Sequence, residues 1–152
     1  MAYDAPDGMN SIKYLVGSGV DANGVVDSTA WIGPIKVEGL GHRGEGAGVV
    51  LANVNDNRRK DLVFMVYDAA EGQNSFKFRI ELDPTENGVA AASERWQYPG
   101  LGHHAEGAGL TAADLDGNGL PDLIVMAYDD PGDDDHRNNL FKYKVLRDAL
   151  KP

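Results

Sequence analysis

An internal repeat constrains the fold of this chain more than any other feature of its sequence. Residues 39–48 read GLGHRGEGAG, and residues 100–109, which begin 61 positions later, read GLGHHAEGAG. Residues 61–68 (DLVFMVYD) and 122–129 (DLIVMAYD) have the same separation of 61 positions, and the opening residues 1–4 (MAYD) match the ends of both. Self-similarity of this kind predicts a repeat architecture, in which each unit is a supersecondary element that packs against its neighbours.

One unit reads as four β-strands. Residues 48–54 are rich in small and β-branched side chains and residues 62–67 are apolar throughout, as in strands that are covered on both faces. Residues 75–82 alternate between apolar and charged side chains, which predicts a half-exposed third strand. Asn87 and Gly88 favour a tight hairpin leading to a fourth strand near residues 95–98. Nineteen glycines and little helical periodicity favour an all-β fold.

The loop expected between the first and second strands of the last unit is rich in oxygen ligands. Residues 114–122, DLDGNGLPD, have oxygen-bearing side chains at alternate positions, and Ca²⁺ binds six to eight such oxygens. Residue 125 is valine, whereas the helix–loop–helix calcium motif requires glutamate there, so we expect a calcium loop inside a β-hairpin. The alternative is an acidic turn without metal. The predicted ligands are Asp114, Asp116, Asn118, Asp122 and the backbone carbonyl of Leu120.

The corresponding loop of the preceding unit, residues 53–61 (NVNDNRRKD), has lost most of this charge. Asparagines replace aspartates, so that the ligand charge falls from −3 to −1 between the two loops, and ligand charge tunes calcium affinity. We expect this loop to bind calcium weakly, or to close by side-chain hydrogen bonds instead. Its weaker candidate ligands are Asn53, Asn55, Asn57, Arg59 and Asp61.

The sequence around the charged loop resembles a known family of repeats. The GAG motif at 107–109, followed by AADLDGNGLPDLIV at 112–125, is similar to the FG-GAP, or VCBS-type, repeats of integrin α-chain propellers, fungal propeller lectins and many bacterial secreted proteins. The preceding unit is a weaker match, and the Phe-Gly pair usual in that family is absent. The resemblance implies β-propeller blades of four antiparallel strands, calcium as the cofactor, and an extracellular or cell-surface location, although residues 1–7 lack the features of a signal peptide.

The chain is expected to be one repeat domain over residues 1–152 that holds about 2.4 units of 61 to 65 residues. Residues 1–38 would form a partial blade, 39–99 a full blade and 100–152 a second partial blade. Propellers have four or more blades, so this chain cannot close a ring alone. Either it is a fragment of a longer propeller, or it forms a homo-oligomer that completes the ring and covers the open edges.

Two further groups of residues are candidates for ligand contact. Each unit has a histidine and a glutamate three positions apart in its glycine-rich segment, where they can contact a ligand or hydrogen-bond backbone groups of tight turns. Aromatic residues of the outer strand can stack on sugar rings or pack between blades. These candidates are His42, Glu45, His103 and Glu106, and Trp31, Trp96 and Tyr98.

Composition and motifs limit the function classes. A net charge of −10 argues against nucleic acid and anionic membranes as partners, and the absence of cysteine excludes disulfides and thiol catalysis. No nucleophile elbow, phosphate loop or paired-carboxylate arrangement is evident, so we do not expect an enzyme. We expect a non-catalytic, lectin-like or adhesion-like module that binds a glycan or an extracellular protein. The alternatives are a self-assembling structural propeller, and a propeller-type polysaccharide lyase or dehydratase with His103 and Glu106 in a shared cleft.

Overall fold

The part of the chain that the computed structural model describes consists of β-strands and their connections. It comprises residues 2–4, 11–17, 21–25, 31–41, 44–68, 74–85, 90–101, 105–129 and 140–148. Over these residues no helix has the length and apolar character needed to cross a membrane. The ten strands are β1 (Ala2–Asp4), β2 (Ser11–Gly17), β3 (Trp31–Glu38), β4 (Gly44–Ala52), β5 (Asp61–Asp68), β6 (Ser75–Leu82), β7 (Ala92–Pro99), β8 (Ala105–Ala113), β9 (Asp122–Asp129) and β10 (Leu140–Leu146).

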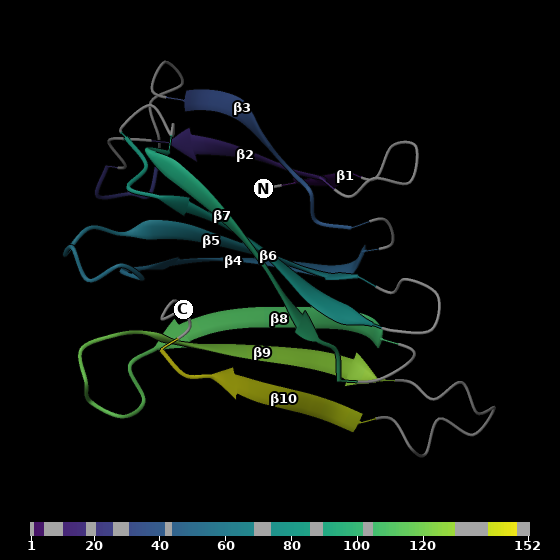
Figure 1. The fold of residues 1–152 in the computed structure, drawn as a ribbon. Coiled ribbons are helices and arrows are strands. Elements are labelled where there is room, and N and C mark those ends of the chain that lie inside the picture. Colours follow the sequence, from purple (N-terminus) through teal and green to yellow (C-terminus); the bar gives the residue numbers. More distant parts are fainter. Residues whose placement is uncertain are drawn as a thin grey trace.

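The strands form three antiparallel sheets stacked on one another (Figure 1). The first sheet has the order β1-β2-β3, the middle sheet β4-β5-β6-β7 and the third sheet β10-β9-β8. The middle sheet is a four-stranded meander over the residues expected for the full unit, and β6 has the predicted bounds. An all-β, antiparallel fold is therefore confirmed.

The first strand of the middle sheet, β4, differs from its prediction. It begins at Gly44 and ends at Ala52, whereas the sequence suggested residues 48–54. The small residues at its start can pair with the end of β5 because a bulge between Gly44 and Gly46 absorbs one residue. The glycine-rich segment is thus partly a strand and not only a connection.

The hairpins β4-β5 and β8-β9 have the same register. Gly46 pairs with Tyr67 and Gly107 pairs with Tyr128, 61 positions later in each case, and each β4 or β8 strand has a bulge just before that glycine. The third strands also correspond, because Tyr67 pairs with Phe76 and Tyr128 with Phe141. The separation of 61 residues in the sequence therefore recurs in the hydrogen-bonding pattern.

The core lies between the sheets, and β5 is buried on both of its faces. Successive side chains of a strand point to opposite faces, so β5 supplies two clusters. Phe64 and Val66 pack toward the first sheet, with Ile12 and Tyr14. The other face joins the middle sheet to the third. Its fully buried members include Val63, Met65, Tyr67, Phe76, Phe78 and Ile80 from the middle sheet, and Leu123, Val125 and Ala127 from the third.

The connection from β7 to β8 is attached to the middle sheet by Tyr67. The hydroxyl of Tyr67 accepts a hydrogen bond from the backbone N–H of Leu101 at 3.1 Å. A Cβ on Gly100 would lie 2.7 Å from the same hydroxyl oxygen and 2.5 Å from the carbonyl oxygen of Asn74. Glycine is needed at position 100 because the connection passes so close to the end of β5.

Candidate functional site

The loop of residues 114–122 joins β8 to β9 and is folded around the carboxylate of Asp114. This carboxylate accepts hydrogen bonds from the backbone N–H groups of Gly117 at 2.7 Å, Gly119 at 2.8 Å and Asn118 at 3.1 Å. Gly117 and Gly119 have φ values of +78° and +87°, which glycine adopts without strain. The N–H of Gly119, followed by those of Gly117 and Asn118, lowers the pKa of Asp114 below its ordinary value. The backbone N–H groups of the loop thus stabilise the negative charge of the Asp114 carboxylate.

Asp122 ties this loop to the end of β10. Its buried carboxylate accepts hydrogen bonds from the N–H of Leu115 at 3.1 Å and from the N–H of Asp148 at 3.0 Å. Asn118 accepts a bond from the N–H of Leu120 at 2.7 Å and donates its side-chain N–H to the carboxylate of Asp148, also at 2.7 Å. Asp148 is therefore part of the site.

Sequence reasoning missed Asp148 although a signal was present. The third strands are offset by 65 positions, as residues 75–78 and 140–143 show, and this offset relates Asp83 to Asp148. The loop motif alone cannot indicate such a residue, because the end of a third strand approaches the loop only in the folded sheet. Both aspartates follow the last residues of their strands closely.

The five ligands predicted for calcium lie in the connection from β8 to β9, where Asp122, the first residue of β9, is buried. Asp114 and Asp116 are exposed, and Asp116 accepts a hydrogen bond from the N–H of Asn118 at 3.2 Å. Across the described ranges, no three His, Asp or Glu side chains are gathered into an arrangement that would hold a metal. The donor set still has the chemistry of a calcium site, with three carboxylates, one amide oxygen and one backbone carbonyl.

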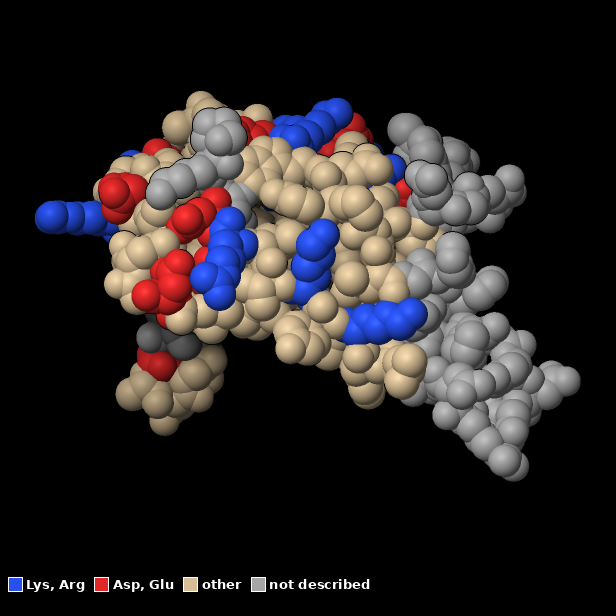
Figure 2. Space-filling model, turned by 60° about the horizontal axis from the view of Figure 1, so that its bottom comes forward, with Lys and Arg blue, Asp and Glu red and all other residues tan. Residues whose placement is uncertain are grey.

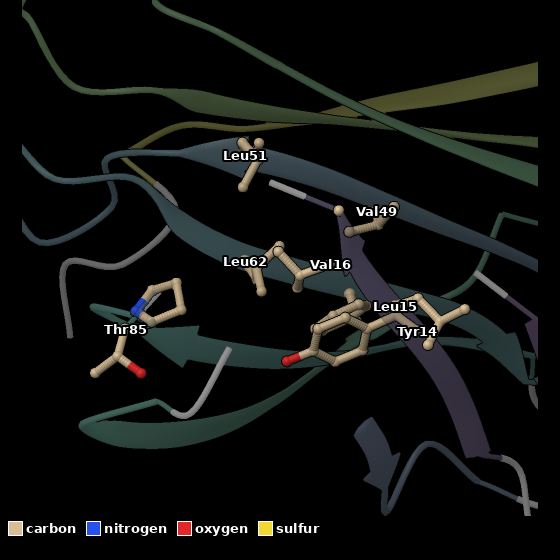
Figure 3. Close-up of a pocket in the computed structure, with 10 residues that line it drawn as sticks. Tyr14, Leu15, Val16, Val49, Leu51, Leu62 and Thr85 are labelled. Carbon is tan, nitrogen blue, oxygen red and sulfur yellow. The ribbon is translucent and has the colours of Figure 1, made fainter. Parts of the chain in front are cut away.

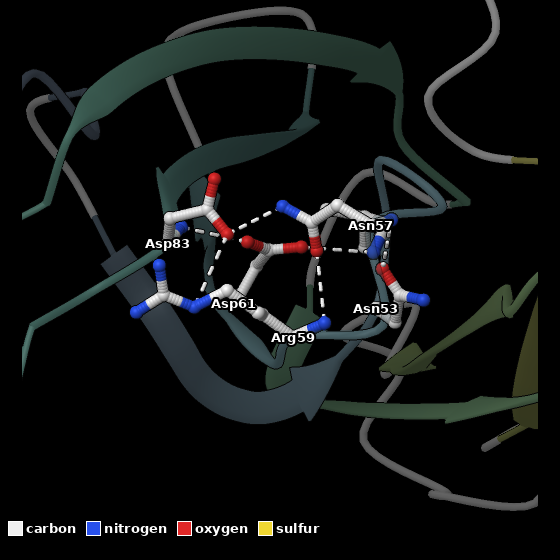
Figure 4. A network of polar contacts seen from close by, with 6 residues as sticks. Asn53, Asn57, Arg59, Asp61 and Asp83 are labelled. Atoms are coloured by element: carbon white, nitrogen blue, oxygen red, sulfur yellow. Dashed lines mark hydrogen bonds and ion pairs between the residues drawn. The ribbon is translucent and has the colours of Figure 1, made fainter.

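The loop of residues 53–61 has several of the same hydrogen bonds, with Asn53 at the position of Asp114 (Figure 4). Asn53 accepts a bond from the N–H of Asn57 at 3.2 Å, and Asn57 accepts one from the N–H of Arg59 at 2.9 Å. The buried carboxylate of Asp61 accepts a bond from the N–H of Val54 at 2.9 Å. The side-chain hydrogen bonds that the sequence suggested for this loop are present, and they occur in both loops.

Asp83 contacts the loop of residues 53–61, which we call the first loop, in the same way that Asp148 contacts the loop of residues 114–122, the second loop. Its backbone N–H donates to Asp61 at 2.8 Å, and its carboxylate accepts the side-chain N–H of Asn57 at 2.5 Å. The guanidinium of Arg59 approaches the same carboxylate oxygen, with its Nε at 3.8 Å (Figure 4). The corresponding residue of the other loop is Leu120, so a positive side chain is present at this position in the first loop and absent from it in the second.

The backbone of the two loops follows the same path. Asp56 and Arg58 have φ values of +58° and +68°, at the positions that Gly117 and Gly119 occupy in the other loop. Asp83 and Asp148 also match, with φ values of +47° and +44°. A left-handed conformation costs a residue with a side chain about 1–2 kcal/mol. The first loop therefore keeps a conformation that its own sequence favours less.

Two of the three aromatic candidates take part in packing between sheets. Trp96 and Tyr98 of β7 are partly buried against the core between the middle and third sheets. The ring of Tyr98 lies 6.0 Å from that of Phe78, edge to face, and the ammonium of Lys144 lies 5.9 Å from its centroid. Trp31, by contrast, lies on β3 of the first sheet and is 49% exposed.

The histidine and glutamate candidates fall outside what the structure describes. His42 and His103 are not among the described residues, and the same holds for the side chains of Glu45 and Glu106. Their suggested roles in ligand contact, in hydrogen bonds to backbone groups of tight turns or in catalysis remain predictions.

A pocket of about 400 Å³ lies between the first and middle sheets (Figure 3). Residues 14–17 of β2, Val49 and Leu51 of β4, and Leu62 and Phe64 of β5 line it. Burial, followed by the nearby charge of Glu81, raises the pKa of the Tyr14 phenol in its wall. Sequence reasoning missed this pocket because β2 is distant in the chain from the β4-β5 hairpin and from Pro84 and Thr85, which complete the lining.

Comparison of this chain with protein-family models, with curated proteins and with solved structures finds no match. The likeness to FG-GAP repeats therefore depends on the loop motif and on the repeat.

Proposed function

We propose that this chain is a calcium-stabilised, non-catalytic binding module built from β-propeller blades of the FG-GAP type, and that Ca²⁺ binds in the loop of residues 114–122. The observation that carries the proposal is the difference between two loops with the same backbone path. Arg59 brings a positive charge to Asp83 in one loop, whereas the other loop has Leu120 at that position and more carboxylates around it.

Electrostatics explains why the second loop would need a cation. Asp114, Asp116, Asp122 and Asp148 lie in or against this loop, and like charges that are close together repel one another. A hard divalent cation with oxygen ligands offsets that repulsion. In the first loop, asparagines and Arg59 have the same effect within the protein itself. Calcium is thus proposed to stabilise a turn and not to take part in chemistry.

The blade architecture is supported by the sheets themselves. The middle sheet is a four-stranded antiparallel meander, and its first strand lies against the first strand of the third sheet. A four-stranded antiparallel sheet of this kind is the unit that a propeller repeats around its axis. An extracellular or cell-surface location follows from the same resemblance and is part of the proposal.

For the ligand, an adhesion-like role with a protein partner is favoured over a lectin-like role. Trp96 and Tyr98 pack between sheets, which leaves Trp31 as the exposed tryptophan of the described residues. The pocket beside β2 has mainly aliphatic and aromatic walls, whereas a sugar site needs several polar groups to bind hydroxyls. A glycan remains the alternative ligand.

Calcium binding is tested by thermal unfolding in calcium, in magnesium and in chelator. A ligand that binds only the folded state at 100 times its Kd adds about 2.7 kcal/mol of stability, so calcium should raise the melting temperature of the wild-type chain. Asp116→Ala should abolish this increase, whereas Asn55→Ala, at the matched position of the first loop, should preserve it. A wild-type chain whose melting temperature is the same in calcium and in chelator would disprove the proposal.

The role of the cation is tested by introducing an arginine at position 120, which corresponds to Arg59. Leu120→Arg places a guanidinium where Arg59 stands in the first loop, so it should weaken calcium binding measured by titration calorimetry. Leu120→Met keeps the size without the charge and should bind calcium like the wild-type chain. Equal affinities for the two variants would show that charge at this position does not control the site.

A further inference from the structure

The outward side of the third sheet is an apolar surface, which we call the outer face. It consists of three positions on β9 and the three positions on β10 that pair with them in register. Phe141 is 69% exposed, Tyr143 72% and Met126 41%. The outer face comprises Ile124, Met126, Tyr128, Phe141, Tyr143 and Val145.

The matching positions of the middle sheet form an interface between sheets. They have the same kinds of side chain, in the order valine, methionine, tyrosine, phenylalanine, phenylalanine and isoleucine, and each is at most 1% exposed. What buries them is the apolar face of the third sheet, with Leu123 and Val125 at its centre. The outer face thus has the composition of a surface that another sheet covers. The matching residues are Val63, Met65, Tyr67, Phe76, Phe78 and Ile80.

None of the six residues of the outer face is charged. Lys142 and Lys144 alternate with its residues along β10 and so point to the other side of the sheet, where Lys144 lies over the ring of Tyr98. Figure 2 shows the molecule from the β10 side, where much of the surface is tan, several Lys and Arg side chains lie across it, and the Asp and Glu side chains gather toward the margins. Two chains, each with a net charge of −10, can therefore approach through this surface without placing carboxylates against each other.

We propose that the outer face binds the outer face of a second copy of this chain, so that two third sheets stack across a two-fold axis. The proposal rests on the exposed residues of β9 and β10 and not on calcium. An aromatic side chain buries about 200 Å², so the exposed parts of Phe141 and Tyr143 supply roughly 300 Å² in each copy. This is about a third of one partner's share of a standard interface, and the other four residues and the strand backbone add to it.

A head-to-tail arrangement, as in a ring of shared blades, is disfavoured by the position of β2. In a head-to-tail arrangement the outer face of one copy would cover Val49 and Leu51, which line the pocket of the next copy. The contact would resemble the one that the middle sheet makes with the third sheet within a single chain. Strand β10 of the first copy would then need the place that Tyr14 already occupies, against Phe64 at a ring distance of 5.0 Å. Face-to-face stacking leaves every strand of both copies in place.

Single-cysteine cross-linking tests this geometry, because the chain has no cysteine of its own. Near a two-fold axis, a residue faces its own counterpart. Tyr143→Cys should therefore form a disulfide-linked dimer under mild oxidation, and Leu51→Cys, which replaces a residue 62% exposed elsewhere, should not. A double variant that links only position 143 of one copy to position 51 of another would overturn the face-to-face arrangement in favour of a head-to-tail one.

Molar mass by light scattering tests the association itself. The wild-type chain should be a dimer, and Phe141→Asp should be a monomer that still unfolds cooperatively, because residue 141 is exposed within one chain. A monomeric wild-type chain at all concentrations would overturn the proposal. Each sample is also measured with calcium and with chelator. A monomer that calcium still stabilises contradicts only this inference, whereas a dimer indifferent to calcium contradicts only the proposed calcium site.

Discussion

Gly46 of β4 lies against the backbone of Ala108 in β8, so closely that a Cβ at position 46 would overlap the Ala108 nitrogen. Two positions further along, a Cβ on Gly48 would lie 2.9 Å from the Cβ of Leu110. The first strands of two neighbouring sheets therefore meet backbone to backbone. This contact is why β4 has glycine at positions 46 and 48.

Gly46→Ala should destabilise the chain by about 2–3 kcal/mol, because overpacking against backbone cannot be relieved by moving a side chain. Gly107 has the same position in β8, but no atom lies within 4 Å of its Cβ site. Gly107→Ala should therefore cost less than about 1 kcal/mol. The free energy of unfolding in urea measures both effects. Equal costs at the two glycines would contradict the observed packing of β4 on β8.

Asp61→Ala should lower the free energy of unfolding by about 3 kcal/mol, since it leaves the N–H groups of Val54 and Asp83 without their acceptor. Asp61→Asn retains one acceptor oxygen and should cost about half as much. The measurement is urea denaturation with and without calcium. Because Asp61 acts here as a hydrogen-bond acceptor, the two conditions should give the same loss, and a loss confined to calcium would contradict this role.

Arg58→Gly should stabilise the chain by about 0.5–1 kcal/mol, because glycine removes the strain of the left-handed conformation. The greater conformational freedom of glycine in the unfolded state offsets part of this gain. Gly119→Ala, at the matching position, should have the opposite sign and a similar size. Arg58→Ala is the control and should have little effect, since alanine is strained there as well. Thermal unfolding of the three variants decides the point, and a stabilising Gly119→Ala would refute the shared backbone path.

The carboxyl of Asp114 should titrate below its ordinary value of 3.8 in chelator, because the N–H of Gly119 and two further N–H groups favour its ionised form. A lowered folded-state pKa means that this carboxylate stabilises the fold above pH 3.8, and that its contribution is lost as the pH falls through the lower, folded-state value. Side-chain carboxyl NMR measures the pKa directly, with Asp114→Asn to assign the signal. A pKa at or above 3.8 would show that the loop does not hold the carboxylate in this way.

Trp96→Ala should cost about 2–3 kcal/mol, less than for a fully buried tryptophan, because its ring packs against the core between two sheets. Trp31→Ala should cost less than about 1 kcal/mol, since Trp31 is 49% exposed. Chemical denaturation separates the two. Saturable binding to a glycan array that Trp31→Ala abolishes would instead favour the lectin-like alternative.

Much of the local structure could be predicted because the relevant interactions are close in sequence. The alternation in residues 75–82 gave the bounds of β6, and the shared offset of 61 residues is matched by the register of two hairpins. The spacing of residues 114–122 predicted a calcium loop, which stays a prediction, but it did not indicate Asp148, because the end of β10 meets this loop only after β9 and β10 have paired. The pocket between Tyr14 and Leu51 was missed for the same reason.

The sequence by itself determined the all-β class, the repeat and the turn chemistry of the two loops, since each depends on side chains a few positions apart. Only the tertiary structure decided which equivalent residues are buried. Tyr67 and Tyr128 have the same strand neighbours, yet Tyr67 is wholly buried and Tyr128 only partly, because another sheet covers one and not the other. Burial depends on what packs against the face of a sheet, and a local sequence pattern does not contain that information.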